Sequence, residues 1–327
     1  MRALVYTGPE AIELRDVADP ERGDEALVRI AHVGICGSDM HAWAGHDDRR
    51  PAPLILGHEA AGEVIEGPLA GRRVTVNPLV TCGACPACRS GRENICPGRQ
   101  IISMPPREGA FAELLTIPEC NLVPVPEAVP TAKAALAEPL ACGWHAVRLG
   151  AARLDRPLRE ARCLVQGGGA IGLGAALVLR AHGAAEIHLA EPSPARRAVL
   201  AREPGLEVFD PGQGGPEGVD LVIDGVGIEA TRAAASAAVR PGGVIMHVGL
   251  GSGAGGLDIR RMTLQEITFT GTYTYTAREF RDTAEAIFDG RLGALDWPET
   301  RPLADGPAAF AEIRAGRTAA PKILLTP

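Results

Sequence analysis

The chain has 327 residues, 46% hydrophobic and 22% charged, which is ordinary for a globular protein and excludes a disordered or coiled-coil chain. At about 150 residues per domain, two domains are expected. The 33 basic and 40 acidic residues give a net charge of −7, which argues against nucleic acid or an anionic membrane as the main partner. The first residues lack the apolar core of a signal peptide, so we expect a cytoplasmic protein.

Hydrophobic patterning divides the chain at about residues 140 and 275. Up to residue 140, short apolar runs between Gly/Pro turns predict strands. These runs are Ala26–Val33, Gly62–Ile65, Arg73–Val76 and Ala112–Thr116. From about residue 159, strands and helices alternate, which predicts an α/β domain with a doubly wound parallel sheet. Its expected strands are Arg162–Gln166, Glu186–Ala190, Gly218–Asp224, Gly243–Gly249 and Ile267–Thr270. Three helices are expected in it: one that follows the glycine-rich turn and ends at Ala181, one at Ala195–Arg202 and one at Glu229–Val239. A helix at Glu279–Phe288 and an apolar end at Lys322–Leu325 follow.

A glycine-rich turn stands between the first of these strands and its helix. Gly167 allows the tight turn, Gly169 lets a pyrophosphate approach the backbone, and Gly172 lets helix and strand pack closely. Ala170 and Ile171 open the helix, whose N-terminus presents free N–H groups to phosphates. This context predicts a dinucleotide site, although a glycine-rich turn without a ligand has the same composition.

The choice of dinucleotide depends on the end of the next strand, where Glu191 stands. An acid there binds the adenosine ribose hydroxyls and repels a 2′-phosphate, which favours NAD over NADP. Ser193, Arg196 and Arg197 follow directly and could hold a phosphate, so NADP stays the alternative.

Four cysteines, Cys82, Cys85, Cys88 and Cys96, fall within fifteen residues. Four thiolates at this spacing can close a tetrahedral zinc site with no open position, which predicts a structural zinc. A DNA-reading zinc finger is disfavoured by the acidic balance of the chain. A disulfide cluster is disfavoured by the expected reducing compartment.

Further candidate ligands are dispersed along the first half of the chain: Cys36, His58, Glu59 and Glu138. A thiolate, an imidazole and a carboxylate make a three-ligand zinc site with one position open for water or substrate. Taken singly, each residue also fits a packing or surface role. Their order relative to the other two motifs favours the zinc interpretation.

These motifs together resemble the zinc-dependent medium-chain dehydrogenases, in the sorbitol (polyol) branch, over essentially the whole chain. The resemblance rests on CGSDMH, GHEAAGEV, the four cysteines, GAFAEL, EPLA and GGGAIG. It implies a GroES-like β-rich catalytic domain, residues 1–140 and 276–327, around a Rossmann domain, residues 141–275. It further implies hydride transfer between NAD and a secondary alcohol such as a polyol or sugar acid, in a homodimer or homotetramer.

The same resemblance implies roles for individual residues. A catalytic zinc would lie on Cys36, His58 and Glu59, with Glu138 beside it as a ligand or as the partner of its water. Asp39 would orient His58. Ser38 and His41 would relay the alcohol proton to solvent.

One departure from the family pattern concerns the substrate. Many polyol dehydrogenases have Phe-Arg-Tyr after the last Rossmann strand, whereas this chain has Thr274 in the arginine position. The alternatives are an L-threonine 3-dehydrogenase and a zinc-bearing binding protein without turnover. The polar loop from His46 to Arg50 would flank the entrance of the cleft; it could contact substrate, but a solvated loop is favoured. Cys120, Cys142 and Cys163 are expected to serve packing only.

Overall fold

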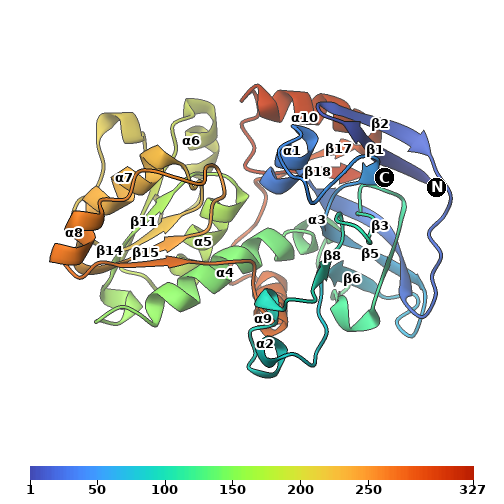
Figure 1. Cartoon of the computed structure of the whole chain (residues 1–327), viewed down its shortest axis with the longest axis horizontal. Coiled ribbons are helices and arrows are strands. Elements are labelled where there is room, and N and C mark those ends of the chain that lie inside the picture. The colour runs from blue at the N-terminus through green and yellow to red at the C-terminus, as the bar shows by residue number, and fades with distance from the viewer.

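The structure is a computed structural model that describes all residues 1–327. Figure 1 shows two units side by side, a β-rich unit that holds both chain ends and an α/β unit with the Rossmann architecture. Helix α4 (Ala137–Ala151) runs from the first unit to the second. None of the helices is both long and apolar enough to cross a membrane.

The β-rich unit is built around strand β3 (Ala26–Gly34), which pairs antiparallel with β5 (Glu59–Glu66) and with β18 (Ile323–Thr326). Because β18 comes from the C-terminus, the end of the chain completes the sheet that its beginning starts. This sheet also contains β6 (Arg73–Val76), β9 (Leu114–Ile117), β10 (Leu122–Pro124) and β17 (Glu299–Pro302). Smaller sheets hold β1 (Arg2–Gly8), β2 (Ala11–Asp16), β4 (Leu54–Ile55), β7 (Leu79–Val80) and β8 (Gln100–Ile101).

The helices of the β-rich unit are short. They are α1 (Gly37–Trp43), α2 (Pro86–Arg89), α3 (Thr131–Ala134), α10 (Gly306–Arg314) and the single 3₁₀ turns Glu93–Ile95, Glu119–Asn121 and Leu303–Asp305. Their first member, α1, follows β3 directly and carries the CGSDMH motif.

The α/β unit is a six-stranded parallel sheet with the strand order β13-β12-β11-β14-β15-β16, which is the order of a doubly wound dinucleotide-binding fold. Its strands are β11 (Arg162–Gln166), β12 (Glu186–Ala190), β13 (Glu207–Phe209), β14 (Val219–Asp224), β15 (Val239–His247) and β16 (Thr268–Gly271). Its helices are α5 (Ala170–Ala181), α6 (Pro194–Leu200), α7 (Glu229–Ala238) and α8 (Ile259–Leu264), with 3₁₀ turns at Leu158–Glu160 and Pro211–Gln213. Helix α9 (Ala277–Phe288) follows its last strand. The order reverses at β11, so the glycine-rich turn after β11 lies where such sheets bind their ligands.

Two helices add to what the sequence predicted. Helix α4 lies where the hydrophobic pattern gave no helix, because it is buried on nearly all sides and therefore has no polar face to mark a period. Helix α9, expected in the C-terminal part of the catalytic domain, packs Phe280 and Ala284 into the same buried cluster as α4 and α5. The α/β unit thus shares its core with the segment that follows it.

Candidate active site and metal centres

A cavity of about 480 Å³ lies between the two units. Ser38, His41, Glu138 and Ile171 line it, together with residues of the glycine-rich loop after β15 and of the segment Thr272–Tyr275. The cavity therefore joins the sequence-predicted catalytic residues to the predicted dinucleotide site.

The three predicted ligands of the catalytic zinc lie together at this cavity: Cys36 and His58 line it, and Glu59 is buried beside them. Cys36 precedes α1, and His58 and Glu59 stand at the start of β5, beside β3. Their ligand atoms all lie within 4.8 Å of one another. A thiolate, an imidazole and a carboxylate at this spacing fit a zinc ion with an open position.

A buried carboxylate holds the ring of His58 in place. Asp39 Oδ1 lies 3.3 Å from His58 Nδ1, and Asp39 also accepts hydrogen bonds from the backbone N–H groups of Cys36 and Gly57. Burial opposes a charge on His58, but the Asp39 carboxylate outweighs it and raises the pKa of His58 well above its usual value. The other nitrogen, Nε2, lies 3.5 Å from Ser38 Oγ. Nε2 is therefore the nitrogen available to a metal.

Glu138 lies in the first turn of α4 and lines the cavity, outside the group of three mutually close ligands. Tyr275 donates its hydroxyl hydrogen to Glu138 Oε1 over 2.9 Å. Burial raises the pKa of Glu138 to about 7. No sequence motif marked Tyr275 for a role in the site.

A buried lysine neutralises Glu59. Lys322 Nζ lies 2.7 Å from Oε1 and 2.6 Å from Oε2 of Glu59, and it donates to the carbonyl of Ile35. The carboxylate fits because residue 34 is glycine: a Cβ there would lie 2.0 Å from Glu59 Oε2. Burial disfavours the charged lysine, yet Glu59 and the Cys36 thiolate outweigh it and raise the pKa of Lys322. Only β18, which is distant in sequence, brings this lysine to the site.

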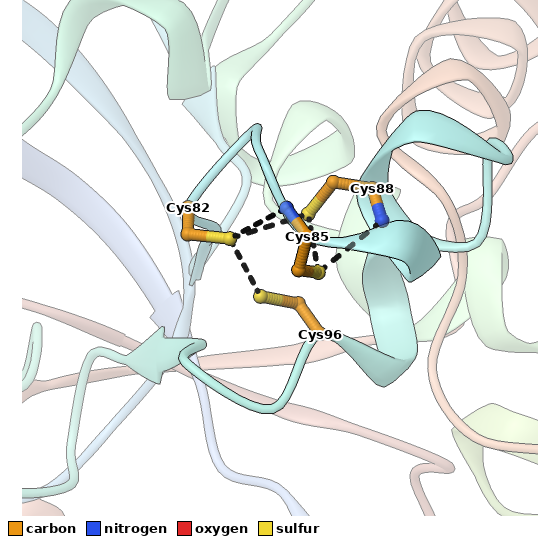
Figure 2. A group of neighbouring side chains, drawn as sticks. All are labelled: Cys82, Cys85, Cys88 and Cys96. Atoms are coloured by element: carbon orange, nitrogen blue, oxygen red, sulfur yellow. Dashed lines mark hydrogen bonds between the residues drawn. The ribbon is translucent and has the colours of Figure 1, made fainter.

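The four predicted ligands of the structural zinc form a second cluster (Figure 2). The Cys85–Cys88 and Cys82–Cys96 sulfur pairs are each 3.5 Å apart, and the Cys82–Cys88 pair is 3.8 Å apart. Sulfurs bound to one zinc at about 2.3 Å in a tetrahedron lie about 3.8 Å from each other. The donor set and its size therefore fit zinc.

The glycine-rich turn leaves room where a cofactor needs it. Gly167 has φ +93°, and a Cβ on Gly172 would lie 1.8 Å from the carbonyl oxygen of Gly167, so the turn and its helix require both glycines. Around Gly169 nothing lies within 4 Å of such a Cβ. Ala170 begins α5, and its N-terminus faces this open space.

Glu191 follows β12 and is buried, with Oε2 accepting from the N–H of Gly168 and Oε1 from that of Ser193. Arg196 Nη1 lies 3.9 Å from Glu191, while Arg196 Nη2 donates to the carbonyl of Thr318 in the other unit. The carboxylate is thus held rigidly beside the glycine-rich turn.

The loop after α1 forms a charged wall of the cavity, and His46, Asp48 and Arg49 in it are exposed, while Arg50 is buried. Asp47, Arg49 and Arg50 all line the cavity. Arg49 is bound to both carboxylate oxygens of Asp47, at 2.7 and 2.9 Å. Arg50 is buried, and its Nε and Nη1 donate to the carbonyls of Ser103 and Ser38. Two guanidinium groups therefore lie on this wall beside the carboxylate of Asp47, and Glu138 is the other carboxylate that lines the cavity.

Comparison with known proteins identifies the family. Residues 22–127 match the family "Alcohol dehydrogenase GroES-like domain", and residues 170–289 match the family "Zinc-binding dehydrogenase". L-Galactonate-5-dehydrogenase of Escherichia coli is 34% identical over 311 residues, which cover 90% of this chain and 89% of that protein.

Solved structures agree with this assignment. L-Idonate 5-dehydrogenase from Escherichia coli superposes with a TM-score of 0.87 at 26% identity, covering 99% of this chain and 97% of that chain. A protein described as a zinc-binding dehydrogenase from Sinorhizobium meliloti, bound to NADP, gives 0.87 at 27% identity, covering 100% and 99%. None of these relatives is a threonine dehydrogenase. The chain therefore belongs to the zinc-dependent medium-chain dehydrogenases, in their polyol branch, and is a zinc- and NAD(P)-dependent alcohol oxidoreductase.

Proposed function

We propose that this enzyme oxidises a secondary hydroxyl group of an open-chain sugar acid, with NAD as the hydride acceptor. The carrying observation is the cavity wall in which the guanidinium groups of Arg49 and Arg50 lie beside Asp47, away from the Glu138 carboxylate on α4. Guanidinium groups on this wall suit a carboxylate on the substrate better than a neutral polyol. The relatives named for L-galactonate and L-idonate support the same substrate class.

In this proposal, Cys36, His58 and Glu59 hold the catalytic zinc, and Cys82, Cys85, Cys88 and Cys96 hold the structural one. The catalytic zinc supplies Lewis acidity that makes a hydroxyl proton easier to remove. Asp39 keeps His58 oriented, and Lys322 balances the charge of Glu59. Glu138, held by Tyr275, is close enough to the cavity to serve as a further ligand or to bind a water molecule.

Ser38 is the first acceptor of the alcohol proton in this proposal. Ser38 lines the cavity, and Arg50 donates a hydrogen bond to its carbonyl. The Ser38 hydroxyl is therefore held in the cavity, beside the predicted zinc ligand His58. His41 lies one turn further along α1, lines the same cavity and is exposed, which suits it to pass the proton to solvent. The domains 1–140 with 276–327 and 141–275 would enclose the substrate between them.

A substrate panel with NAD⁺ and NADP⁺ tests the substrate class. L-Galactonate and L-idonate should be oxidised with a higher kcat/KM than galactitol or sorbitol. Arg49→Met should raise KM for the sugar acids about tenfold or more, because a hydrogen bond to a charged group contributes about 1.5–3 kcal/mol. KM for the neutral polyols, the internal control, should not change. Preference for neutral polyols in the wild type, or turnover of L-threonine, would contradict the proposal.

We also propose NAD as the preferred cofactor, a homo-oligomer and a reducing compartment. The carboxylate of Glu191, which the backbone N–H groups of Gly168 and Ser193 hold in place, supports NAD as the preferred cofactor. Exposed Ile259 and Leu264 belong to α8, the helix that leads into the edge strand β16, and support self-association through that edge. The zinc-binding thiolates suit the cytoplasm. Light scattering of the wild type and of Leu264→Glu tests the assembly; a monomeric wild type would contradict it.

A further inference from the structure

The four-cysteine lobe, residues Cys82–Arg99, contacts a segment nearly 180 residues away, Tyr273–Ala277. Asn94 Nδ2 donates to the carbonyl of Tyr273 over 2.8 Å, and the N–H of Ala277 donates to Glu93 Oε1 over 2.6 Å. The guanidinium carbon of Arg99 lies 4.9 Å from the ring centre of Tyr273. Ala277 is the first residue of α9, so the lobe contacts the start of that helix through Glu93.

All three contacting residues of the lobe lie close to Cys96. Glu93 and Asn94 form the 3₁₀ turn that leads into Cys96, and Arg99 Nη1 donates to the carbonyl of Cys96 over 2.9 Å. The lobe has little apolar core, since Cys82, Pro86 and other residues of its tip are exposed. Small elements of this kind take most of their folding energy from a bound metal. The cysteine cluster therefore also determines where these three side chains lie.

The contacted segment is part of the substrate cavity. Tyr273, Thr274 and Tyr275 line it, and the Tyr275 hydroxyl binds Glu138 beside the catalytic metal site. Thr274 has φ +46°, which costs free energy in a β-branched residue and persists only where neighbours enforce it. Its Oγ1 is buried without a hydrogen-bond partner in the protein. The lobe binds the backbone on both sides of this residue, at Tyr273 and at Ala277.

We propose that Asn94 is a positioning residue for the alcohol site, and that the four-cysteine lobe, through Asn94, Glu93 and Arg99, holds the cavity segment around Thr274 in its strained form. The lobe then does more than stabilise the fold: it sets the shape of the substrate side of the cavity. The NAD side, built on Gly167–Gly172 and Glu191, has no contact of this kind with the lobe. This positioning role rests on the alcohol oxidoreductase activity, but it does not require the substrate to be a sugar acid.

Asn94→Asp is the discriminating variant, because it keeps the size of the side chain and removes the N–H donor to Tyr273. Asn94→Ala removes the contact without adding a charge. Arg92→Ala is the matched control, since Arg92 is an exposed residue of the same lobe. Each variant is prepared with zinc, and zinc per subunit, circular dichroism and steady-state kinetics are measured with whichever alcohol the wild type oxidises.

Both Asn94 variants should keep two zinc ions per subunit and raise KM for the alcohol about tenfold, with KM for NAD⁺ within twofold of the wild type. A readout independent of turnover is amide hydrogen exchange of the peptide that contains Tyr273–Ala277. Its exchange should accelerate in both Asn94 variants and in Cys88→Ser, and not in Arg92→Ala.

Two results would overturn the proposal. One is exchange at 273–277 as slow in the Asn94 variants as in the wild type. The other is a parallel rise in KM for alcohol and NAD⁺, which would indicate general loosening of the fold. If the wild type oxidises no alcohol in the panel, the exchange measurement still decides the positioning role while the proposed function fails separately.

Discussion

Replacing Lys322 with methionine tests how the catalytic metal site balances its charges. Lys133 and Lys322 are the two lysines of the chain, and Lys322 is the one buried against Glu59. In Lys322→Met, the carboxylate of Glu59 stays fully buried and loses its cation. The methionine keeps the length and apolar body of the lysine, so the change is mainly one of charge.

The magnitude follows from the geometry of the pair. At 2.7 Å, and with an effective dielectric constant of about 20, two unit charges attract by about 6 kcal/mol. Much of this attraction only compensates for the cost of removing both charges from water. Removing one partner of a buried pair typically costs about 3–5 kcal/mol, because the other charge is left unpaired. We expect a loss of this size in the free energy of unfolding of the zinc-free protein, which corresponds to about 4–7 °C in Tm for a chain of 327 residues.

Thermal unfolding of zinc-free and zinc-loaded protein measures the effect. The loss should be smaller with zinc, because the metal replaces part of the missing positive charge. Lys133→Met is the matched control: its partner Asp296 is 72% exposed, and such surface pairs contribute about 0–1 kcal/mol. If Lys322→Met and Lys133→Met unfold at the same temperature without zinc, the charge-balance argument is wrong.

Three other changes test separate parts of the molecule. Ser38→Ala should slow alcohol oxidation about 10²–10⁴-fold with zinc content and NAD binding intact, as expected for loss of a proton acceptor; unchanged turnover would remove Ser38 from the mechanism. Glu191→Ala should weaken binding of NAD more than of NADP by fluorescence titration, and an equal loss for both would contradict a ribose contact. Burial opposes ionisation of Glu279, but hydrogen bonds from His145, Thr276 and Arg148 lower its pKa to about 2. Since the unfolded pKa is about 4.3, this carboxylate stabilises the fold above that pH and the contribution is lost as pH falls toward 2. Glu279→Gln should therefore flatten stability between about pH 4.5 and 2 in acid unfolding monitored by circular dichroism, and an unaltered slope would refute the assignment.

The sequence by itself determined the features whose parts are close together along the chain. The four cysteines fall within fifteen residues, so their spacing alone predicts a zinc-sized cluster. The glycine-rich turn follows its strand directly, and both the strand Arg162–Gln166 and the sheet class agree with the prediction. Local spacing is informative here because a turn or a short loop brings such residues together whatever the rest of the chain does.

Only the tertiary structure decided which distant residues complete the site. Lys322 and Glu59 are 263 residues apart, Tyr275 and Glu138 are 137 apart, and Asn94 and Tyr273 are 179 apart. A single buried lysine or asparagine leaves no periodic pattern, so nothing in its sequence neighbourhood marks it. Its partner is set by how the C-terminal strand closes the first sheet and how the four-cysteine lobe packs on the start of α9. The cavity wall with Asp47, Arg49 and Arg50 was also decided by the tertiary structure. The sequence does not show that Arg50 is buried against two carbonyls at a cavity, because residues distant in the chain form that environment.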